Sequence, residues 1–482
     1  MSNKHKIKII GLGAGLPDKA DLRANGPLLW LPLLRDCQVI CASRGLLDLL
    51  QASRNELWPD TDPARQQPSP LFIPIDARLE ALAARLTALR DQGDKICVLA
   101  GGDPLFYGIG SSLTRYFSPD ELEILPGVSS MQEACARLAL PWTDLRHISL
   151  HGRSDWQDFD CAALTGHPIC LLLDEKHSLL DLATRLLERG RAKYRLHYFG
   201  GLGSAKEQHL EFDSEELCQT GPGQKNYLKA AAENLAKPGL VLLLPKTSSR
   251  EWPRPFMGMP DNLFQHEAGL ISKQPVRAAA LAALRLRPWH SLLDIGAGCG
   301  SVGIEACALL PEGRVYALEK HPARVAQILF NRQALGAVNL EVVQAEAEEA
   351  IRTNSAVCPP ANGAKQSAAN NPAQLPASGS VDRIFIGGGL SGEKGCKLLE
   401  AAWAYLAPGG RLTAACVLLG SLETCRRGLE RLVMQDRQAG RDDQTGQIDI
   451  CSIQAGLGAA LAGDTQIKAL NQVFILSADK KK

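Results

Sequence analysis

One glycine-rich loop restricts the fold of this chain more than any other feature. Residues Leu292–Ala306 read LLDIGAGCGSVGIEA, an apolar run that ends in aspartate and is followed by alternating glycines. This order predicts a strand, a loop at the carboxyl end of that strand, and then a helix. In open α/β sheets ligands bind at the carboxyl ends of strands, and glycines there let the backbone approach a ligand closely. The loop therefore predicts a ligand site.

Glu319 indicates which kind of ligand this site takes. It ends the next apolar run, RVYALE, about twenty residues after the loop, where a carboxylate can accept hydrogen bonds from ribose hydroxyls. Ser301 stands where the dinucleotide motif G-x-G-x-x-G would have its third glycine, so the spacing is Gly296-x-Gly298-x-Gly300. This form favours S-adenosylmethionine. NAD, or a loop that only turns the chain, remains an alternative.

A different set of glycine loops occurs in the first part of the chain. Three predicted strands, at Ile7–Ile10, Ile96–Ala100 and Leu122–Leu125, run into GLGAG (11–15), GGDPLFYGIG (101–110) and PGVSS (126–130). One such loop is weak evidence of a site. Three of them, in this order and spacing, form a pattern that resembles the loops of one known family.

Short apolar runs alternate with helical patterns along the chain, which is typical of parallel α/β sheets. The rhythm stops in the polar, proline-rich stretch at 249–270, which predicts a linker between domains at 1–248 and 271–482. The first domain divides into lobes at about 1–118 and 119–248. Residues 354–380 are nearly free of large apolar side chains and predict a disordered insertion.

Composition excludes several classes of protein. The net charge of +1 gives no reason to expect nucleic acid or an anionic membrane as a partner. The apolar stretch near the N-terminus is too short for a signal peptide, so a cytoplasmic location is expected. None of the 14 cysteines forms a Cys-x-x-Cys pair, and most lie in apolar runs, which predicts buried thiols and no metal site.

The N-terminal loops resemble those of the tetrapyrrole methylases, and the loop at 296–300 resembles that of the seven-strand methyltransferases. With both loop systems in one chain, the sequence resembles, over nearly its whole length, the fused precorrin-6Y C5,15-methyltransferase (decarboxylating) family of cobalamin biosynthesis. The segment MGMPDNLFQHEAGLISKQPVRAAALAALRLRP is similar to that family's stretch between its halves. The resemblance implies a bilobal tetrapyrrole-methylase fold followed by a Rossmann-like methyltransferase domain.

The resemblance also implies site residues and partners. S-adenosylmethionine would bind at two sites, and the expected cofactor-binding residues are Gly101, Gly102, Asp103, Pro104, Ser129 and Ser130 in the first, with Ser272, Gly296, Ala297, Gly298, Cys299, Gly300, Glu319 and Ala347 in the second. The substrate would be a tetrapyrrole, methylated at carbons 5 and 15 and decarboxylated on the ring-C acetate. Relatives often assemble, so a homo-oligomer is expected.

The expected chemistry needs few specialised side chains. Methyl transfer from a sulfonium is an in-line displacement for which positioning supplies most of the help. No catalytic residue is therefore assigned. Because the substrate carries many carboxylates, arginines are expected in the clefts, and Arg44 and Arg277 are the candidates.

Two alternatives remain open from the sequence. One is a uroporphyrinogen-type methylase fused to a methyltransferase with another substrate. The other is a tetrapyrrole-binding half that is inactive or regulatory, attached to one active half. The segment Gly200–Gly203 reads GGLG where relatives of the family commonly have Glu-Asn-Leu-Gly, which keeps the second alternative open.

Overall fold

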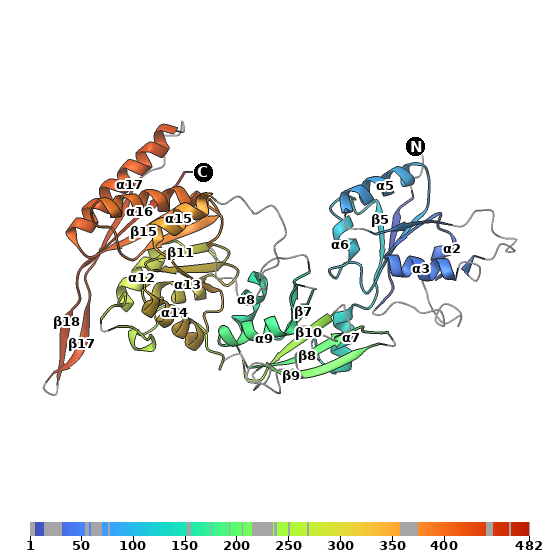
Figure 1. Cartoon of the computed structure of the whole chain (residues 1–482), viewed down its shortest axis with the longest axis horizontal. Helices are drawn as coiled ribbons and strands as arrows, with labels where there is room; N and C mark the ends of the chain where they lie inside the picture. The colour runs from blue at the N-terminus through green and yellow to red at the C-terminus, as the bar shows by residue number, and fades with distance from the viewer. Residues whose placement is uncertain are drawn as a thin grey trace.

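The described part of the chain folds into three sheet-based bodies and one projecting two-stranded hairpin, shown in the computed structural model of Figure 1. The structure describes residues 5–13, 31–53, 57–58, 70–75, 78–151, 156–174, 176–191, 193–204, 206–214, 235, 239–248, 251–267, 269–356, 375–439, 447–461 and 464–481. In the view of Figure 1 the second lobe, in green, lies between the first lobe, in blue, and the C-terminal domain, in yellow to red.

The first lobe is a five-stranded parallel sheet of order β3-β2-β4-β1-β5. Its elements are β1 (Ile7–Gly11), α2 (Leu31–Arg35), β2 (Val39–Ala42), α3 (Arg44–Ala52), β3 (Leu71–Pro74), α5 (Leu79–Asp91), β4 (Ile96–Ala100), α6 (Ile109–Leu113) and β5 (Leu122–Leu125). Separate apolar clusters cover its faces, one with α2 and α3 and one with α5 and α6, as parallel sheets require. Because β5 pairs with β1, the first lobe extends past the boundary expected near 118.

The second lobe is a mixed five-stranded sheet of order β6-β7-β10-β8-β9, in which only β6 and β7 are parallel. Its elements are α7 (Ser130–Arg137), β6 (Arg146–Ser149), α8 (Gln157–Ala163), β7 (Ile169–Leu172), α9 (Leu179–Glu188), β8 (Tyr194–Gly200), β9 (Gln208–Asp213) and β10 (Gly239–Pro245). Helices α8 and α9 pack on one face, and α7 packs on the other.

The C-terminal domain is a seven-stranded sheet of order β13-β12-β11-β14-β15-β19-β16. The first five strands in this order, β13, β12, β11, β14 and β15, are parallel to one another. Strand β19 is antiparallel to both of its neighbours, β15 and β16. The elements are η1 (Asp261–Leu263), α12 (Gln274–Ala283), β11 (Ser291–Ile295), α13 (Ser301–Leu309), β12 (Arg314–Glu319), α14 (Pro322–Leu335), β13 (Leu340–Gln344), α15 (Ala347–Ala356), β14 (Val381–Ile386), α16 (Gly392–Tyr405), β15 (Leu406–Cys416), α17 (Leu419–Ala439), β16 (Asp449–Ile453), β17 (Gly456–Leu461), β18 (Asp464–Ala469) and β19 (Val473–Asp479).

Helices cover both faces of this sheet. Helices α12, α13 and α14 share one apolar cluster with the sheet, and α15, α16 and α17 share the other. The β17–β18 hairpin projects from the domain (Figure 1). The architecture confirms the predicted α/β fold class, a bilobal N-terminal half followed by a Rossmann-like seven-strand domain.

Two stretches expected to be irregular take part in the core at their ends. In the range expected as a linker, Trp252 packs in the second-lobe cluster, and Met259 and Phe264 pack in the C-terminal cluster. Of the expected insertion, residues 357–374 lie outside the described residues. Its flanks do not behave as an insertion, because residues 354–356 end α15 and Leu375 is buried beside the sheet.

Candidate functional sites

The three N-terminal glycine loops meet at the carboxyl ends of neighbouring strands. Strands β4, β1 and β5 lie side by side, so the loops that follow them converge. The amide of Gly102 donates to the carbonyl of Gly13 at 2.7 Å, which joins the first loop to the second. Gly15 and Ala14 of the first loop lie outside the described residues.

Close backbone packing explains two of these glycines. A Cβ at Gly127 would lie 2.5 Å from the carbonyl oxygen of Gly102, and one at Gly11 would lie 2.4 Å from the amide nitrogen of Gly127. At Gly13 and Gly101, by contrast, no atom lies within 4 Å of an added Cβ. The loops therefore pack tightly against one another and leave a bare backbone facing open space, as a ligand cradle requires.

The polar side chains of this site also hold its loops in shape. The Asp103 carboxylate accepts from the amides of Leu105 at 2.8 Å and Phe106 at 3.2 Å. The Ser129 hydroxyl accepts from the amide of Gln132 and caps α7, which begins at Ser130. The amino end of α7, with its free N–H groups, thus points toward the loops that precede it.

The GGDP loop joins the two lobes. Tyr107, with φ of 53°, donates its hydroxyl to the carbonyl of His147 in β6 at 2.8 Å. Phe106 packs edge-on against the His147 ring and against the second-lobe cluster. A left-handed backbone is costly for tyrosine, so these contacts stabilise a strained turn beside the site.

Arg44 lies on the same edge of the first sheet. It begins α3, directly after the carboxyl end of β2, and its side chain is exposed. That position leaves its guanidinium accessible, and its contact with a substrate remains a prediction.

The second site is built on β11, α13 and β12. Gly300 caps α13 in the left-handed region, with φ of 83°. Gly298 has φ of 61° and open space beside its α-carbon, so any side chain there would be strained and would fill the cradle. The amides of Gly296 and Ala297 donate to the carbonyl of Leu318, which fixes the loop against β12.

Glu319 is buried at the end of β12 and already accepts three backbone hydrogen bonds. Its Oε2 accepts from the Gly298 amide at 2.9 Å, and its Oε1 accepts from the amides of Lys320 and His321 at 3.0 Å. A carboxylate has about four acceptor positions. The geometry therefore leaves room for one further donor, such as a ribose hydroxyl.

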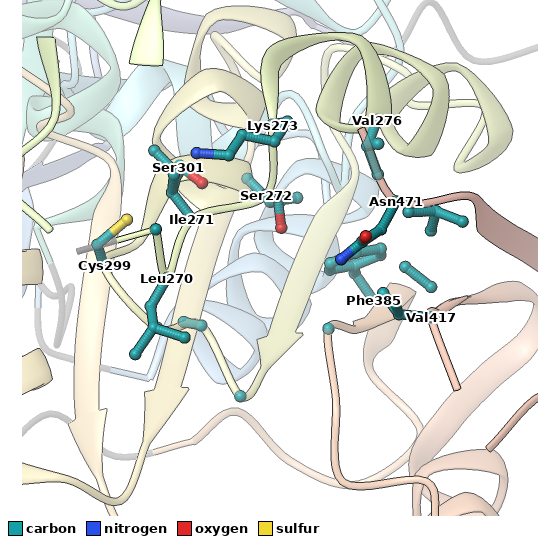
Figure 2. A pocket seen from close by; sticks show the side chains of 18 of the residues that line it. Leu270, Ile271, Ser272, Lys273, Val276, Cys299, Ser301, Phe385, Val417 and Asn471 are labelled. Carbon is teal, nitrogen blue, oxygen red and sulfur yellow. The ribbon is translucent and has the colours of Figure 1, made fainter. Parts of the chain in front are cut away.

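A cavity of about 580 Å³ lies over this loop (Figure 2). Figure 2 shows Cys299 and Ser301 at one end and Phe385, Val417 and Asn471 at the other, with Ser272 between them. This volume falls within the range of small-molecule sites, roughly 300–1,000 Å³. The expected residues that line it are Ser272, Gly296, Ala297, Gly298 and Cys299.

Three expected residues do not line the cavity, namely Gly300, Glu319 and Ala347. Glu319 reaches it through the Gly298 amide. Ala347 begins α15, packs against the apolar core, and is absent from the cavity wall. Its contact with an adenine remains a prediction.

Arg277 is a correction to the expected substrate ligands. Its side chain is fully buried, and its Nε donates to Glu305 at 2.6 Å. Its Nη1 donates to the carbonyl of Ser272 at 2.6 Å and to Asp261 at 3.0 Å. A guanidinium with these partners is not available to a substrate. Arg277 instead fixes the segment that carries Ser272 against the cavity.

Asp294 was not predicted as a site residue. It lines the cavity, is almost completely buried, and accepts from the amide of Gly303 at 3.0 Å. Burial raises its pKa to about 7, with a smaller contribution from Glu319. Its position near the end of the strand, two residues before the first glycine, was the available signal in the sequence.

The remaining wall of the cavity comes from segments without a recognisable motif. Lys273 and Arg324 supply positive charge, and Leu270, Phe385, Val417 and Asn471 are among the other side chains that line it. These residues are far apart in the sequence, so no local pattern could group them.

Neither metal clusters nor membrane spans are found in the described part of the chain. There, no three His, Cys, Asp or Glu side chains are placed to hold a metal ion. No helix among the described residues is both long enough and apolar enough to cross a bilayer.

Two family models match separate parts of the chain. Residues 6–218 match the family of tetrapyrrole (corrin/porphyrin) methylases, and residues 262–361 match a precorrin methyltransferase domain. The fold and the two loop systems, together with these matches, define a methyltransferase with two unlike halves.

The most informative relatives contain both halves. A precorrin-6Y C(5,15)-methyltransferase [decarboxylating] of Sinorhizobium sp. is 32% identical over 70% of this chain and 72% of its own length. The Mycobacterium tuberculosis (strain ATCC 25618 / H37Rv) protein of the same name is 31% identical over 71% of this chain and 76% of its own. The chain therefore belongs to the precorrin-6Y C5,15-methyltransferase (decarboxylating) family.

Other relatives correspond to one half. A probable cobalt-precorrin-6B C(15)-methyltransferase (decarboxylating) of Saccharolobus solfataricus is 27% identical over 48% of this chain and 99% of its own length. A crystal structure of precorrin-6Y C5,15-methyltransferase from Geobacter metallireducens GS-15 is 29% identical and covers 47% of this chain and 100% of its own, with a TM-score of 0.37. Family membership implies S-adenosylmethionine as methyl donor and a tetrapyrrole as substrate.

Proposed function

We propose that this chain methylates carbons 5 and 15 of precorrin-6B, or of its cobalt form, and removes the carboxyl group of the ring-C acetate. The N-terminal half would act on carbon 5, and the C-terminal half would act on carbon 15 and decarboxylate. The observation that carries the proposal is the presence of two separate glycine-loop sites in a chain related over both halves to bifunctional enzymes.

Each half has a backbone that fits the methyl donor. In the C-terminal site, Gly296–Gly300 would lie under the donor, Glu319 would accept from its ribose, and Ser272 would lie near its methionine end. In the N-terminal site, Gly101–Pro104 and the turn at Ser129 and Ser130 would hold it. Open space beside Gly13, Gly101 and Gly298 supports this assignment. The bound donor supplies a methyl group activated on a sulfonium.

The residues around the second cavity suit an anionic macrocycle. Lys273 and Arg324 can pair with carboxylates of the substrate. Val417 lines the cavity, and the exposed Leu418 and Leu419 follow it directly, so apolar surface is available for the flat face of a ring. Arg44 is the corresponding cation of the first site.

The protein's part in the chemistry is orientation. Methyl transfer requires the acceptor carbon in line with the breaking bond, and exclusion of water by the cavity wall assists this. Loss of carbon dioxide can use the conjugated ring as the electron sink, so no metal is included in the proposal. A homo-oligomer and a cytoplasmic location are also retained as predictions.

Two measurements test the proposal. Titration with S-adenosylhomocysteine should give a stoichiometry near two per chain, whereas a value near one would mean that one half is inactive. Incubation with S-adenosylmethionine and precorrin-6B, followed by mass spectrometry, should show two added methyl groups and one lost carboxyl group. A product with one methyl group and no decarboxylation would contradict the assignment.

A further inference from the structure

The second lobe contacts the C-terminal domain through the carboxyl ends of two helices. Helix α9 ends at Glu188 and α14 ends at Leu335, and side chains within or just after the last turn of each helix cross to the other body. The carbonyls of the last turn of a helix have no partner within that helix and carry partial negative charge. Two such ends placed together need donors, and arginines are suited to supply them.

Arginines of the second lobe satisfy carbonyls of the C-terminal domain. Arg189 donates to the carbonyl of Val338 at 2.9 Å and also to that of Leu340. Arg191 donates to the carbonyl of Gly336 at 2.8 Å. Both arginines are buried, Arg191 completely.

The pairing also runs in the opposite direction. Arg332 of α14 donates to the carbonyl of Glu188 at 3.2 Å, and the neighbouring Gln333 donates to the carbonyl of Leu187 at 3.2 Å. Each helix end is therefore capped by side chains of the other body. This reciprocity fixes the relative position of the two surfaces more closely than a one-sided contact would.

Glu341 is the central carboxylate of this surface. Its Oε1 accepts from Arg189 at 2.5 Å and from Arg185 at 3.1 Å, and both donors belong to the second lobe. Burial alone would raise the pKa of Glu341, but Arg189 and Arg185, with Arg314 and Arg332, hold it down at about 2. The group is thus ionised in the folded protein at any ordinary pH.

Asp160 extends the network on the second-lobe side. It is buried and pairs with Arg185 of its own lobe, while Arg314 of β12 lies 3.8 Å from it. Nearby, the Cys161 thiol donates to the carbonyl of Gly313 at 3.4 Å. The contact therefore covers the starts of both β12 and β13.

Packing at this contact is tight. A Cβ at Gly190 would lie 2.1 Å from the carbonyl oxygen of Gln333, and one at Gly336 would lie 2.2 Å from that of Pro253. Both glycines also have φ near +67°, which suits a residue that follows a helix. At Gly190 the backbones of the two bodies are in direct contact, and at Gly336 the C-terminal domain contacts the connecting segment, so neither point has space for a water layer.

The contact lies away from the methyl-transfer cavity. It uses the residues that precede or begin β12 and β13, whereas the cavity lies at the carboxyl ends of the parallel strands. Docking at this edge leaves the cavity open, so the two bodies can stay together throughout a reaction.

We propose that this surface is a docking site in its own right, which binds the N-terminal half to the C-terminal half without help from the peptide that joins them. A buried network of this kind is stable only as a complete set, because removing one partner leaves the others buried and unpaired. The Saccharolobus solfataricus relative is covered over 99% of its own length by 48% of this chain, so a chain of about half this size exists on its own.

The test uses the full-length chain with a site-specific protease sequence inserted between the exposed residues Phe256 and Met257, so that Trp252 stays on the fragment whose core it packs in. After complete cleavage, the two fragments should co-elute in gel filtration at the volume of the uncleaved chain. Separate elution at micromolar concentration would overturn the proposal. Because the readout is association, it does not depend on the proposed activity.

Glu341→Gln in the same cleavable chain tests the network itself. It should raise the dissociation constant of the fragments by about tenfold or more, since it leaves several guanidinium groups without their shared carboxylate. The control is Glu423→Gln, which removes a surface carboxylate of α17 paired with Arg426 and Arg427. Equal dissociation constants for the two variants would overturn the central role of Glu341. Should Glu341→Gln fail to fold, Gln333→Ala removes only one capping bond and should weaken association measurably.

Discussion

The two candidate sites show different ways of building a bare backbone beside a ligand. The C-terminal site takes its loop, helix and acidic residue from one continuous strand–loop–helix–strand unit, 292–319. The N-terminal site collects three loops from three strands and joins them through backbone contacts. A continuous unit can be recognised from its own residues, whereas a composite site depends on the order of strands in the sheet.

The sites also differ in what holds them in place. The segment that carries Ser272 is fixed by the fully buried Arg277. The GGDP loop is fixed to the other lobe by the exposed hydroxyl of Tyr107. Buried charge networks are costly to disrupt and exposed hydrogen bonds are not, so the C-terminal site should be the more rigid of the two.

Arg277→Ala should have the largest effect on stability. It leaves the Glu305 carboxylate buried without its cation, with only the Gly258 amide as a donor, which should cost about 3–5 kcal/mol in the free energy of unfolding. The control is Arg285→Ala, which removes a pairing with Asp449 and Asp479 that is exposed and worth about 1 kcal/mol or less. Urea unfolding of both variants measures the difference, and similar losses would contradict a structural role for Arg277.

Gly298→Val should abolish donor binding in the C-terminal half alone. A β-branched residue at this φ fills the cradle, and we expect affinity there to fall by about a hundredfold or more. The titration stoichiometry should then fall from two to one. Gly379→Val, also at positive φ with open space around it, should leave the stoichiometry unchanged.

Gly127→Val should damage only the N-terminal site. The new side chain would overlap the backbone of the other two loops, at a cost of about 1–3 kcal/mol from overpacking. Carbon-5 methylation should be lost while carbon-15 methylation continues, as mass spectrometry of the products would show. Gly45→Val, with no atom within 4 Å of the new Cβ, serves as the stability control. Loss of both methylations would mean that the halves are not independent.

Asp294 should make the stability of the C-terminal domain depend on pH. Its folded-state pKa of about 7 lies above the ordinary value of 3.8, so the folded state holds the proton longer. This contribution is fully present below about pH 4 and is lost as pH rises to 7, at about 1.4 kcal/mol per pH unit. Asp294→Asn should remove this change of the unfolding free energy with pH, measured by urea unfolding between pH 5 and 7. An unchanged pH dependence would mean that other groups cause it.

Tyr107→Phe should have the smallest effect, about 0.5–1.5 kcal/mol, because it removes one partly solvated hydrogen bond between the lobes. We expect a higher KM for the donor in carbon-5 methylation with little change in kcat. The exposed Tyr116 provides the control variant, Tyr116→Phe. An equal change in carbon-15 methylation would show that the effect is not local to the lobes.

Much of the fold was predictable because its signals are local. The apolar runs that predicted strands, including Ile96–Ala100 and SLLDI, are strands in the structure. The β17–β18 hairpin was not predicted, since its residues are exposed and show little alternation of apolar and polar side chains. Trp252 and Phe264 were placed in a linker because the stretch around them has no period, although both are buried.

The sequence by itself determined the two α/β halves, the glycine loops after strands, and the acid at Glu319. Each of these features depends on residues close together in the chain, through backbone conformation and the periodic spacing of apolar side chains. Only the tertiary structure decided that Arg277 is buried, that Asp294 holds its proton near neutral pH, and that Glu341 joins the two bodies. The reason is that burial and charge pairing depend on residues brought together from distant positions in the chain. The local sequence around a polar side chain does not indicate which partners it has in the folded protein.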